Sequence, residues 1–251
     1  MKTINKKPKY ECAHGRANGG SRLQLQIYVN QFTDELNEAV LEALPSLAQK
    51  KGKLKWVSPL ATEDYAEYRD EEFLKKLGCG ENAKRLKEFW PKRGPCWDAL
   101  ARLEVEGSAD CRGVVLVEAK SHRIEIFGNG CGAKDERLEL IEKSLKDTRD
   151  WLRVPKDINW QWTGPLYQYA NRLAHLYHLP EILSLPVWLV NIYFIYDPDR
   201  PTRYSAWEEF LPEVKEELGL TNIEIPDMAN VFLDAKNPCQ LAENQQGKRK
   251  Q

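Results

Sequence analysis

The sequence predicts an α/β protein in which a mixed central sheet is flanked by helices. Short apolar segments of strand length alternate along the chain with longer segments in which apolar residues recur at helical spacing. Two of the apolar segments are separated only by a short polar interval, which is typical of an antiparallel hairpin. The 251 residues suit one such domain with additions, and the 42% hydrophobic content is enough for a packed core.

The N-terminal part of the chain predicts two strands with a helix between them. Residues 22–30, RLQLQIYVN, alternate apolar and polar side chains with the period of a strand. Residues 33–49 carry apolar side chains every three or four positions, and Thr33 is a suitable N-cap for a helix. Residues 54–60, LKWVSPL, are short and apolar, so we expect another strand there.

The middle of the chain predicts two short helices followed by the hairpin. Residues 63–77 and 81–90 have helical patterns that are separated by GCG. The proline that follows Trp90 must end the second helix. We expect two paired antiparallel strands over 97–105, WDALARLEV, and 113–120, GVVLVEAK.

The C-terminal part of the chain predicts helices in alternation with strands. Apolar residues recur at helical spacing in 137–154, 165–179 and 205–219. The segment 185–197, LPVWLVNIYFIYD, predicts a buried strand, and 230–236, NVFLDAK, predicts a last short one.

The ends of the chain have the composition of segments that lie outside a folded core. We expect flexible segments over 1–20 and 238–251, on either side of a single domain over 21–237. Six cysteines without a CxxC pair, and no apolar signal-peptide core, predict reduced thiols and a cytoplasmic location. The longest apolar stretch, 182–196, is shorter than the roughly 20 residues of a membrane-spanning helix, so we expect no membrane anchor.

The charge of the chain excludes one class of nucleic-acid-binding protein. The formal net charge is −1 and the sequence pI is about 6.5, so the chain lacks the overall basic field of a nucleic-acid coat protein. Any binding to a polyanion must therefore be local. Lysine and arginine do form local clusters, which are Lys6, Lys7 and Lys9; Lys84, Arg85 and Lys87; and Lys92 and Arg93.

The second strand of the hairpin ends with two charged residues on one face. Side chains alternate along a strand, so Glu118 and Lys120 project from the same side. If the turn is centred near Ser108, Asp98 lies directly opposite Glu118, because the two are equally far from the turn; a slip of one residue would send Asp98 to the other face. Opposed carboxylates repel unless a cation lies between them, and Mg²⁺ prefers such oxygen ligands. A bound Mg²⁺ would activate water for attack on a phosphodiester, so these residues predict one metal-dependent site.

PCWDAL followed by VEAK resembles the PD-(D/E)XK nuclease superfamily, which includes restriction endonucleases and Holliday-junction resolvases. The resemblance covers about residues 81–122. It implies a restriction-endonuclease-like core in which Asp98, Glu118 and the Ala119 carbonyl bind Mg²⁺ or Mn²⁺ and Lys120 is the catalytic lysine.

The resemblance also suggests residues outside this motif. An acidic residue on the preceding helix is frequent in the superfamily, and Glu88 is the candidate, with Glu81 next. Some members carry a Gln on a later helix, and Gln168 could fill that place, although Arg172 rather than Tyr stands four positions on. The position that gives the family the Pro of its name is Trp97 here, with a proline two residues earlier.

The function that the resemblance implies is metal-dependent phosphodiester hydrolysis. DNA is the expected substrate, RNA is a second possible substrate, and a homodimer is a possible assembly. The main alternative is a module that keeps the fold and binds nucleic acid or protein without turnover, in which the same charged residues form only a salt bridge. An enzyme of another class that binds a nucleotide is a third hypothesis.

Other groups of polar residues favour structural explanations. The stretch 127–134, FGNGCGAK, lacks the GK[ST] ending of a P-loop and predicts a flexible loop. His175 and His178 lie three positions apart on a helix without a metal-site motif, which favours a packed aromatic helix. His122 and Glu125 follow the hairpin and could join the site.

Overall fold

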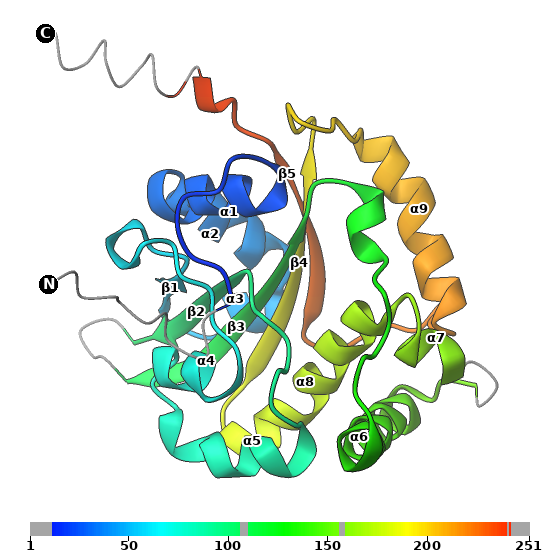
Figure 1. Ribbon diagram of the computed structural model, residues 1–251. Helices are drawn as coiled ribbons and strands as arrows, with labels where there is room; N and C mark the ends of the chain where they lie inside the picture. The colour runs from blue at the N-terminus through cyan, green and yellow to red at the C-terminus, as the bar shows by residue number, and fades with distance from the viewer. Residues whose placement is uncertain (1–11, 106–109, 156–158, 240, 242–251) are drawn as a thin grey trace, which may run out of the picture.

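Five strands form one sheet in the order β1-β2-β3-β4-β5, and helices cover both of its faces (Figure 1). The computed structural model describes most of the chain, namely residues 12–105, 110–155, 159–239 and 241. The strands are β1 (Lys53–Ser58), β2 (Ala99–Glu104), β3 (Cys111–Lys120), β4 (Val187–Ile195) and β5 (Met228–Asp234). The predicted α/β class with a mixed central sheet is confirmed.

Most of the predicted helices occur near their expected positions. The patterns over 33–49, 137–154, 165–179 and 205–219 correspond to helices that begin at Thr33, Asp135, Tyr167 and Tyr204. The α-helices are α1 (Gly20–Gln31), α2 (Thr33–Ala43), α3 (Pro45–Ala48), α4 (Asp70–Lys76), α5 (Ala83–Phe89), α6 (Asp135–Leu152), α7 (Asn159–Thr163), α8 (Tyr167–Leu183) and α9 (Tyr204–Glu217). Short 3₁₀ helices are η1 (Ala61–Glu63), η2 (Gly80–Asn82) and η3 (Arg123–Ile126).

The sheet is mixed because β2 runs antiparallel to both of its neighbours. Strands β3, β4 and β5 are parallel to one another. The parallel pairs are joined through helices, as parallel connections require, whereas β2 and β3 form the predicted hairpin. The centre of its turn lies outside the described residues.

The side chains of β3 divide between two hydrophobic cores, one on each face of the sheet. Val115 and Val117 belong to the core that includes side chains of α1 and α2. Val114 and Leu116 belong to the core that includes side chains of α6 and α8. Because side chains alternate along a strand, Glu118 shares the face of Val114 and Leu116 and is directed toward the α8 side.

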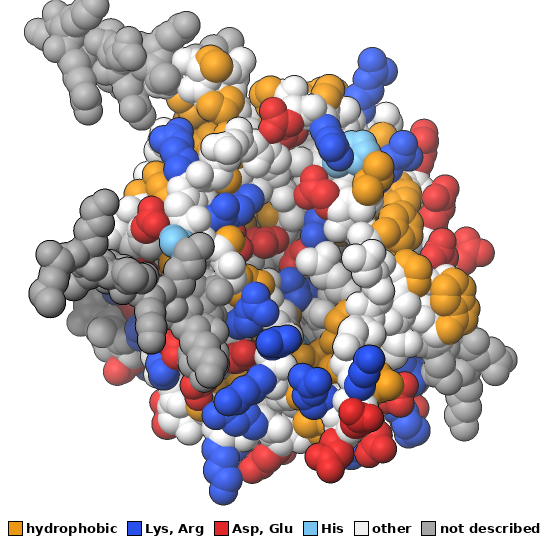
Figure 2. Space-filling model, viewed as in Figure 1, with side chains coloured by type: hydrophobic (Ala, Val, Ile, Leu, Met, Phe, Trp, Pro, Cys, Tyr) orange, Lys and Arg blue, Asp and Glu red, His pale blue; other side chains and the backbone are white. Residues whose placement is uncertain are grey.

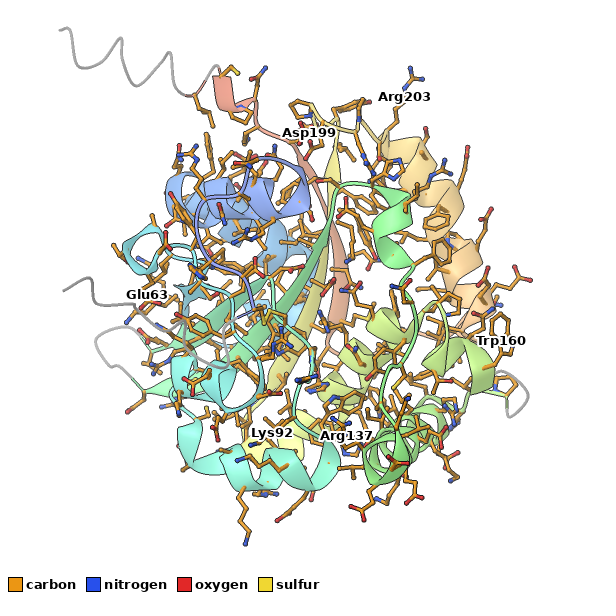
Figure 3. All side chains as sticks on the ribbon, viewed as in Figure 1. Glu63, Lys92, Arg137, Trp160, Asp199 and Arg203 are labelled. Carbon is orange, nitrogen blue, oxygen red and sulfur yellow. A yellow bond between two sulfur atoms is a disulfide. The ribbon has the colours of Figure 1, made fainter. Side chains whose placement is uncertain are left out.

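The strand predicted over 22–30 is wrong, because these residues form helix α1. The polar residues of the alternating pattern do not face solvent, since Gln24 and Gln26 are 1% and 2% exposed. Gln24 exchanges two hydrogen bonds with the backbone of Lys236, and Gln26 accepts one from the backbone N–H of Ala17. The helix also begins beside Asp199 (Figure 3), whose carboxylate accepts the N–H of Gly20. The alternation of apolar and polar residues therefore arises from buried amides that pair with distant backbone groups, and not from a strand.

Residues 12–19, which belong to the N-terminal segment expected to be flexible, hydrogen-bond to the loop before α4 but contribute no buried side chain to the core. The N–H of Gly15 donates to the carbonyl of Asp64 at 2.5 Å, and the N–H of Glu67 donates to the carbonyl of Ala13 at 2.8 Å. Residues 1–11 and most of 238–251 lie outside the described residues.

A disulfide joins Cys12 to Cys96, with the two Cα atoms 5.9 Å apart. The expectation of reduced thiols is therefore wrong for this pair, and it no longer supports a cytoplasmic location. The other described cysteines, Cys79, Cys111, Cys131 and Cys239, are free. Within the described residues, no helix combines the length and apolarity needed to cross a membrane.

We expect Gly113→Ala to destabilise the protein by about 1–3 kcal/mol, because it would overpack the core. A Cβ atom at Gly113 would lie 2.5 Å from Cζ3 of Trp188 and 3.1 Å from the carbonyl oxygen of Pro186. Urea unfolding measures the loss. Gly132→Ala is the matched control, because a Cβ there meets nothing within 4 Å. Equal stability of the two variants would contradict the described packing of β3 against β4.

Candidate functional site

Asp98 lies just before β2 and beside Glu118 at the end of β3. Strand β2 pairs with β3 through Ala99↔Val117 and Leu100↔Leu116, and the N–H of Asp98 donates to the carbonyl of Val117 at 3.1 Å. The Asp98 carboxylate then accepts the N–H of Ala119 on Oδ2 at 2.8 Å. The expected register is confirmed for the paired residues 99–103, whereas Asp98 itself lies just before β2, and its hydrogen bond to Val117 is one residue out of that register.

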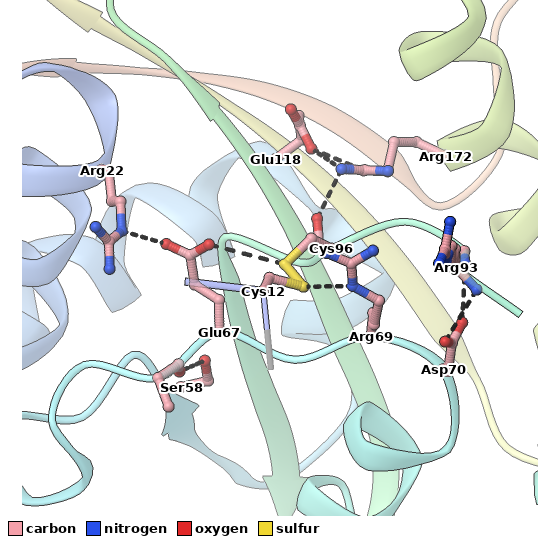
Figure 4. The surroundings of a disulfide bond; sticks show 12 residues. Cys12, Arg22, Ser58, Glu67, Arg69, Asp70, Arg93, Cys96, Glu118 and Arg172 are labelled. Carbon is pink, nitrogen blue, oxygen red and sulfur yellow. Dashed lines mark hydrogen bonds and ion pairs between the residues drawn. A yellow bond between two sulfur atoms is a disulfide. The ribbon is translucent and has the colours of Figure 1, made fainter. Parts of the chain in front are cut away.

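Glu118 is a buried carboxylate with a cation at each oxygen. Its residue exposure is 6%. The ammonium of Lys120 lies 2.6 Å from Oε1. Nε and Nη2 of Arg172 lie 2.7 and 2.5 Å from Oε2 (Figure 4). Two positive charges therefore compensate one carboxylate that has almost no access to water.

Helix α8 supplies the side chains that complete the pairing. Gln168 and Arg172 are four residues apart and so share one face of the helix, which packs against β4. Oε1 of Gln168 accepts a hydrogen bond from Nζ of Lys120 at 3.0 Å. The guanidinium of Arg172 also donates to the carbonyl of Cys96 at 2.7 Å and lies 4.8 Å from the ring centroid of Trp97. Gln168, which the sequence suggested from the later helix, therefore contacts the predicted lysine directly.

Glu67 is a third buried carboxylate of the site and was missed by the sequence analysis. It lies on the loop before α4, which is attached to the segment before β2 by the bridge between Tyr68 and Trp97. Arg22 of α1 donates to Oε1 of Glu67 at 2.8 Å (Figure 4). Burial raises the pKa of Glu67, although Arg22 opposes the change. No motif marks this residue, because only tertiary contacts bring its loop to the hairpin.

The other acidic and histidine candidates lie elsewhere. Glu88 and Glu81, suggested from the preceding helix, are exposed on α5 and η2, whereas Glu67 joins Glu118 in interacting electrostatically with Asp98. Glu125 accepts hydrogen bonds from the hydroxyl of Ser21 and the N–H of Ser121.

His122 and His175 make contacts that support the local structure. Nδ1 of His122 accepts the N–H of Ile124 at the start of η3. His175 packs edge-on against Phe89 and Trp97, and its Nδ1 lies 2.7 Å from the carbonyl oxygen of Asn171. The predicted packed aromatic helix is confirmed.

Burial and charge shift the acid–base equilibria of the site in opposite directions. Burial raises the pKa of Asp98 well above its ordinary value, and the Glu118 carboxylate raises it further. Burial would also raise the pKa of Glu118, but Arg172 and Lys120 outweigh it and hold that pKa below its ordinary value. For Lys120, burial favours the neutral amine, yet Glu118 and Asp98 raise its pKa. The two cations thus stabilise the ionised form of Glu118, whereas positive charge does not offset burial to the same extent at Asp98.

A small cavity adjoins the paired charges. Its lining includes Glu118, Lys120, Gln168, Arg172 and Tyr193, and its volume is about 20 Å³. A water molecule needs roughly 10–15 Å³ on this measure, so the cavity has room for a single water molecule or a small ion. Figure 2 shows that this face of the molecule is hollowed near its centre, with acidic and basic side chains around the hollow.

The donor set limits which metal could bind. Among the residues that the structure describes, no group of three or more His, Cys, Asp or Glu side chains is arranged to hold a metal ion. Two carboxylates are a donor set that suits Mg²⁺, because Mg²⁺ keeps several waters and commonly uses one or two carboxylates.

No protein-family model, curated protein or solved structure matches the chain. The interpretation of the site therefore depends on its own geometry and on the short motif described above.

We expect Asp98→Asn to stabilise the metal-free protein at pH 7 by about 1 kcal/mol. The neutral amide removes repulsion with Glu118 and Glu67, and its oxygen can still accept the N–H of Ala119. The pKa of Asp98 is higher in the folded than in the unfolded protein, so ionisation opposes folding above the ordinary Asp value of about 3.9. The gain must therefore shrink as the pH falls through that value. Urea unfolding with a chelator at pH 7 and pH 3.5 measures it.

An exposed acid provides the control for this charge removal. Glu213→Gln, on the exposed face of α9, should change stability by less than about 0.5 kcal/mol. If Asp98→Asn were less stable than the wild type at pH 7, the account of Asp98 as an electrostatically disfavoured carboxylate would be wrong.

Proposed function

We propose that the chain is a metal-dependent phosphodiester hydrolase that acts on DNA, with RNA as the second substrate to test. The single observation that carries the proposal is that Asp98 hydrogen-bonds to the residues on either side of Glu118, while Lys120 lies on the same face of β3 as Glu118. This is the arrangement that the resemblance to the PD-(D/E)XK superfamily implies. It also supports a restriction-endonuclease-like core built around β2, β3 and α8.

The metal ligands would be Asp98, Glu118 and the carbonyl of Ala119. Mg²⁺ or Mn²⁺ would supply a more acidic water and neutralise charge on the phosphate. One oxygen of Glu118 must leave its present partner to bind the ion. The ammonium of Lys120 is the partner that can then turn toward the substrate, because a single ammonium reaches several acceptors by rotating its flexible stem.

The remaining polar residues of the site would hold its reactive groups in place. Gln168 accepts one N–H of Lys120 and so directs the ammonium along the cavity. Arg172 keeps Glu118 ionised and fixes its carboxylate through two N–H groups. Lys120 would position the attacking water and stabilise negative charge on the phosphoryl oxygens.

One observation favours a binding module without turnover as the second candidate. Both oxygens of Glu118 are already in ion pairs, with Lys120 and with Arg172. If these pairs persist in the presence of Mg²⁺, the cluster is structural. Such a module would retain DNA in a salt-dependent manner without cutting it in any divalent metal.

We expect Lys120→Met to lower DNA cleavage by at least about 100-fold, the usual effect of removing one group that stabilises the transition state. The methionine keeps the aliphatic volume of the lysine but not its charge. Binding of Mn²⁺ should persist, because the carboxylates remain. The measurement is a cleavage screen over plasmid, linear, nicked, branched and single-stranded DNA, with single-stranded RNA, in Mg²⁺ and in Mn²⁺.

Lys146→Met is the matched control, since Lys146 is an exposed ion-pairing lysine of α6. It should cleave at the wild-type rate. Equal cleavage by wild type and Lys120→Met would assign the activity to a contaminant. Retention of DNA without cleavage by any of the proteins would favour the binding module.

A further inference from the structure

The disulfide between Cys12 and Cys96 lies beside the proposed metal ligands. Cys96 is two residues before Asp98 in the chain, and the bond connects it to a residue 84 positions away. The sulfur of Cys96 lies 3.8 Å from Oε2 of Glu67, the third buried carboxylate (Figure 4). The covalent link therefore holds the segment that leads into β2 at the point where the acidic groups meet.

The backbone of Cys96 is also a direct support for Arg172. Its carbonyl accepts Nη2 of Arg172 at 2.7 Å, and the same nitrogen lies 2.5 Å from Oε2 of Glu118. A change in the position of Cys96 must therefore change a contact of the arginine that holds Glu118.

A second set of contacts connects the N-terminal segment to the same carboxylates. The carbonyl of Gly15 accepts Nη2 of Arg22 at 3.0 Å, and Nε of that arginine binds Glu67. The N–H of Glu67 donates to the carbonyl of Ala13. Residues 12–19 are thus attached to the site by the disulfide at Cys12 and by the hydrogen bond between Arg22 and the carbonyl of Gly15.

The surroundings of the disulfide suit its reduction. Both cysteine residues are only partly buried. Nε of Arg69 lies 3.1 Å from the sulfur of Cys12 (Figure 4). A neighbouring guanidinium stabilises a thiolate, and a thiol with a lower pKa is the better leaving group in thiol–disulfide exchange.

We propose that the Cys12–Cys96 disulfide is a redox switch of the adjacent site, active when oxidised and weakened when a dithiol reduces it. The proposal rests on the function proposed above. A thiolate of the dithiol attacks the Cys96 sulfur, the disulfide bond breaks, and Cys12 leaves as a thiolate beside Arg69. The second thiol then displaces Cys96 from the mixed disulfide. The dithiol becomes a disulfide, two electrons pass to the protein, and the two protons of the dithiol end on the cysteines.

Reduction affects the site because the disulfide holds the segment that leads into β2. Once Cys96 is released, its carbonyl no longer keeps a fixed position for Arg172, and Asp98 loses its covalent support two residues upstream. Loss of an outer contact to a metal ligand commonly weakens metal binding by 10- to 100-fold, so we expect Mn²⁺ affinity and cleavage to fall by about tenfold.

The test compares oxidised protein, protein reduced with dithiothreitol and then freed of reductant under nitrogen, and reoxidised protein. Three quantities are measured: hydrogen exchange at the amides of Asp98 and Ala119, Mn²⁺ affinity, and cleavage of DNA. We expect reduction to accelerate the exchange and weaken Mn²⁺ binding and cleavage, and reoxidation to restore all three. Reversal distinguishes the switch from simple unfolding.

Two cysteine variants complete the test. Cys12→Ser removes the bond, so it should behave like reduced protein and ignore dithiothreitol. Cys239→Ser removes an exposed free thiol and should respond as the wild type does. Unchanged exchange and Mn²⁺ affinity on reduction would overturn the switch and leave the nuclease proposal standing. If Mn²⁺ binds in neither state, the nuclease proposal fails, and the exchange rates alone decide whether the disulfide controls the site.

Discussion

A carboxylate buried at the end of β3 is the constraint on which the rest of the site depends. Glu118 has almost no access to water, and an unpaired charge in such a position costs several kcal/mol. Arg172 and Lys120 supply the compensating charges, and one of them comes from α8. Helix α8 must therefore bring Arg172 to the carboxyl-terminal end of β3, and the segment before β2 must offer its carbonyl to the same arginine.

A purely structural ion pair would not require further acidic groups, yet the fold brings two more to the same place. Asp98 comes from the segment just before β2, and Glu67 comes from the loop before α4. Burial raises the pKa of both carboxyls, and repulsion by Glu118 raises it further. Groups whose ionisation the fold disfavours are concentrated at functional sites, where a bound cation can relieve the repulsion. This concentration favours a catalytic or ion-binding function over a salt bridge that serves stability alone.

The part of the site that could be predicted from the sequence is the part encoded locally. Strand alternation and a short turn fix which residues oppose one another, so counting along the hairpin placed Asp98 near Glu118 at the end of β3. Helix α1 could not be recognised, because Gln24 and Gln26 are buried and hydrogen-bonded to backbone outside the helix. The disulfide and the position of Glu67 likewise depend on contacts between segments that are far apart in the chain, for which the sequence carries no periodic signal.

The central claim is that the carboxylates of Asp98 and Glu118 together bind one divalent cation. The most direct test is anomalous scattering from crystals soaked in Mn²⁺. The account predicts one peak about 2 Å from an oxygen of Asp98 and an oxygen of Glu118, with Lys120 turned away from the carboxylate. A Mn²⁺-saturated crystal with no peak at this position, and with Glu118 still paired to Lys120 and Arg172, would contradict it.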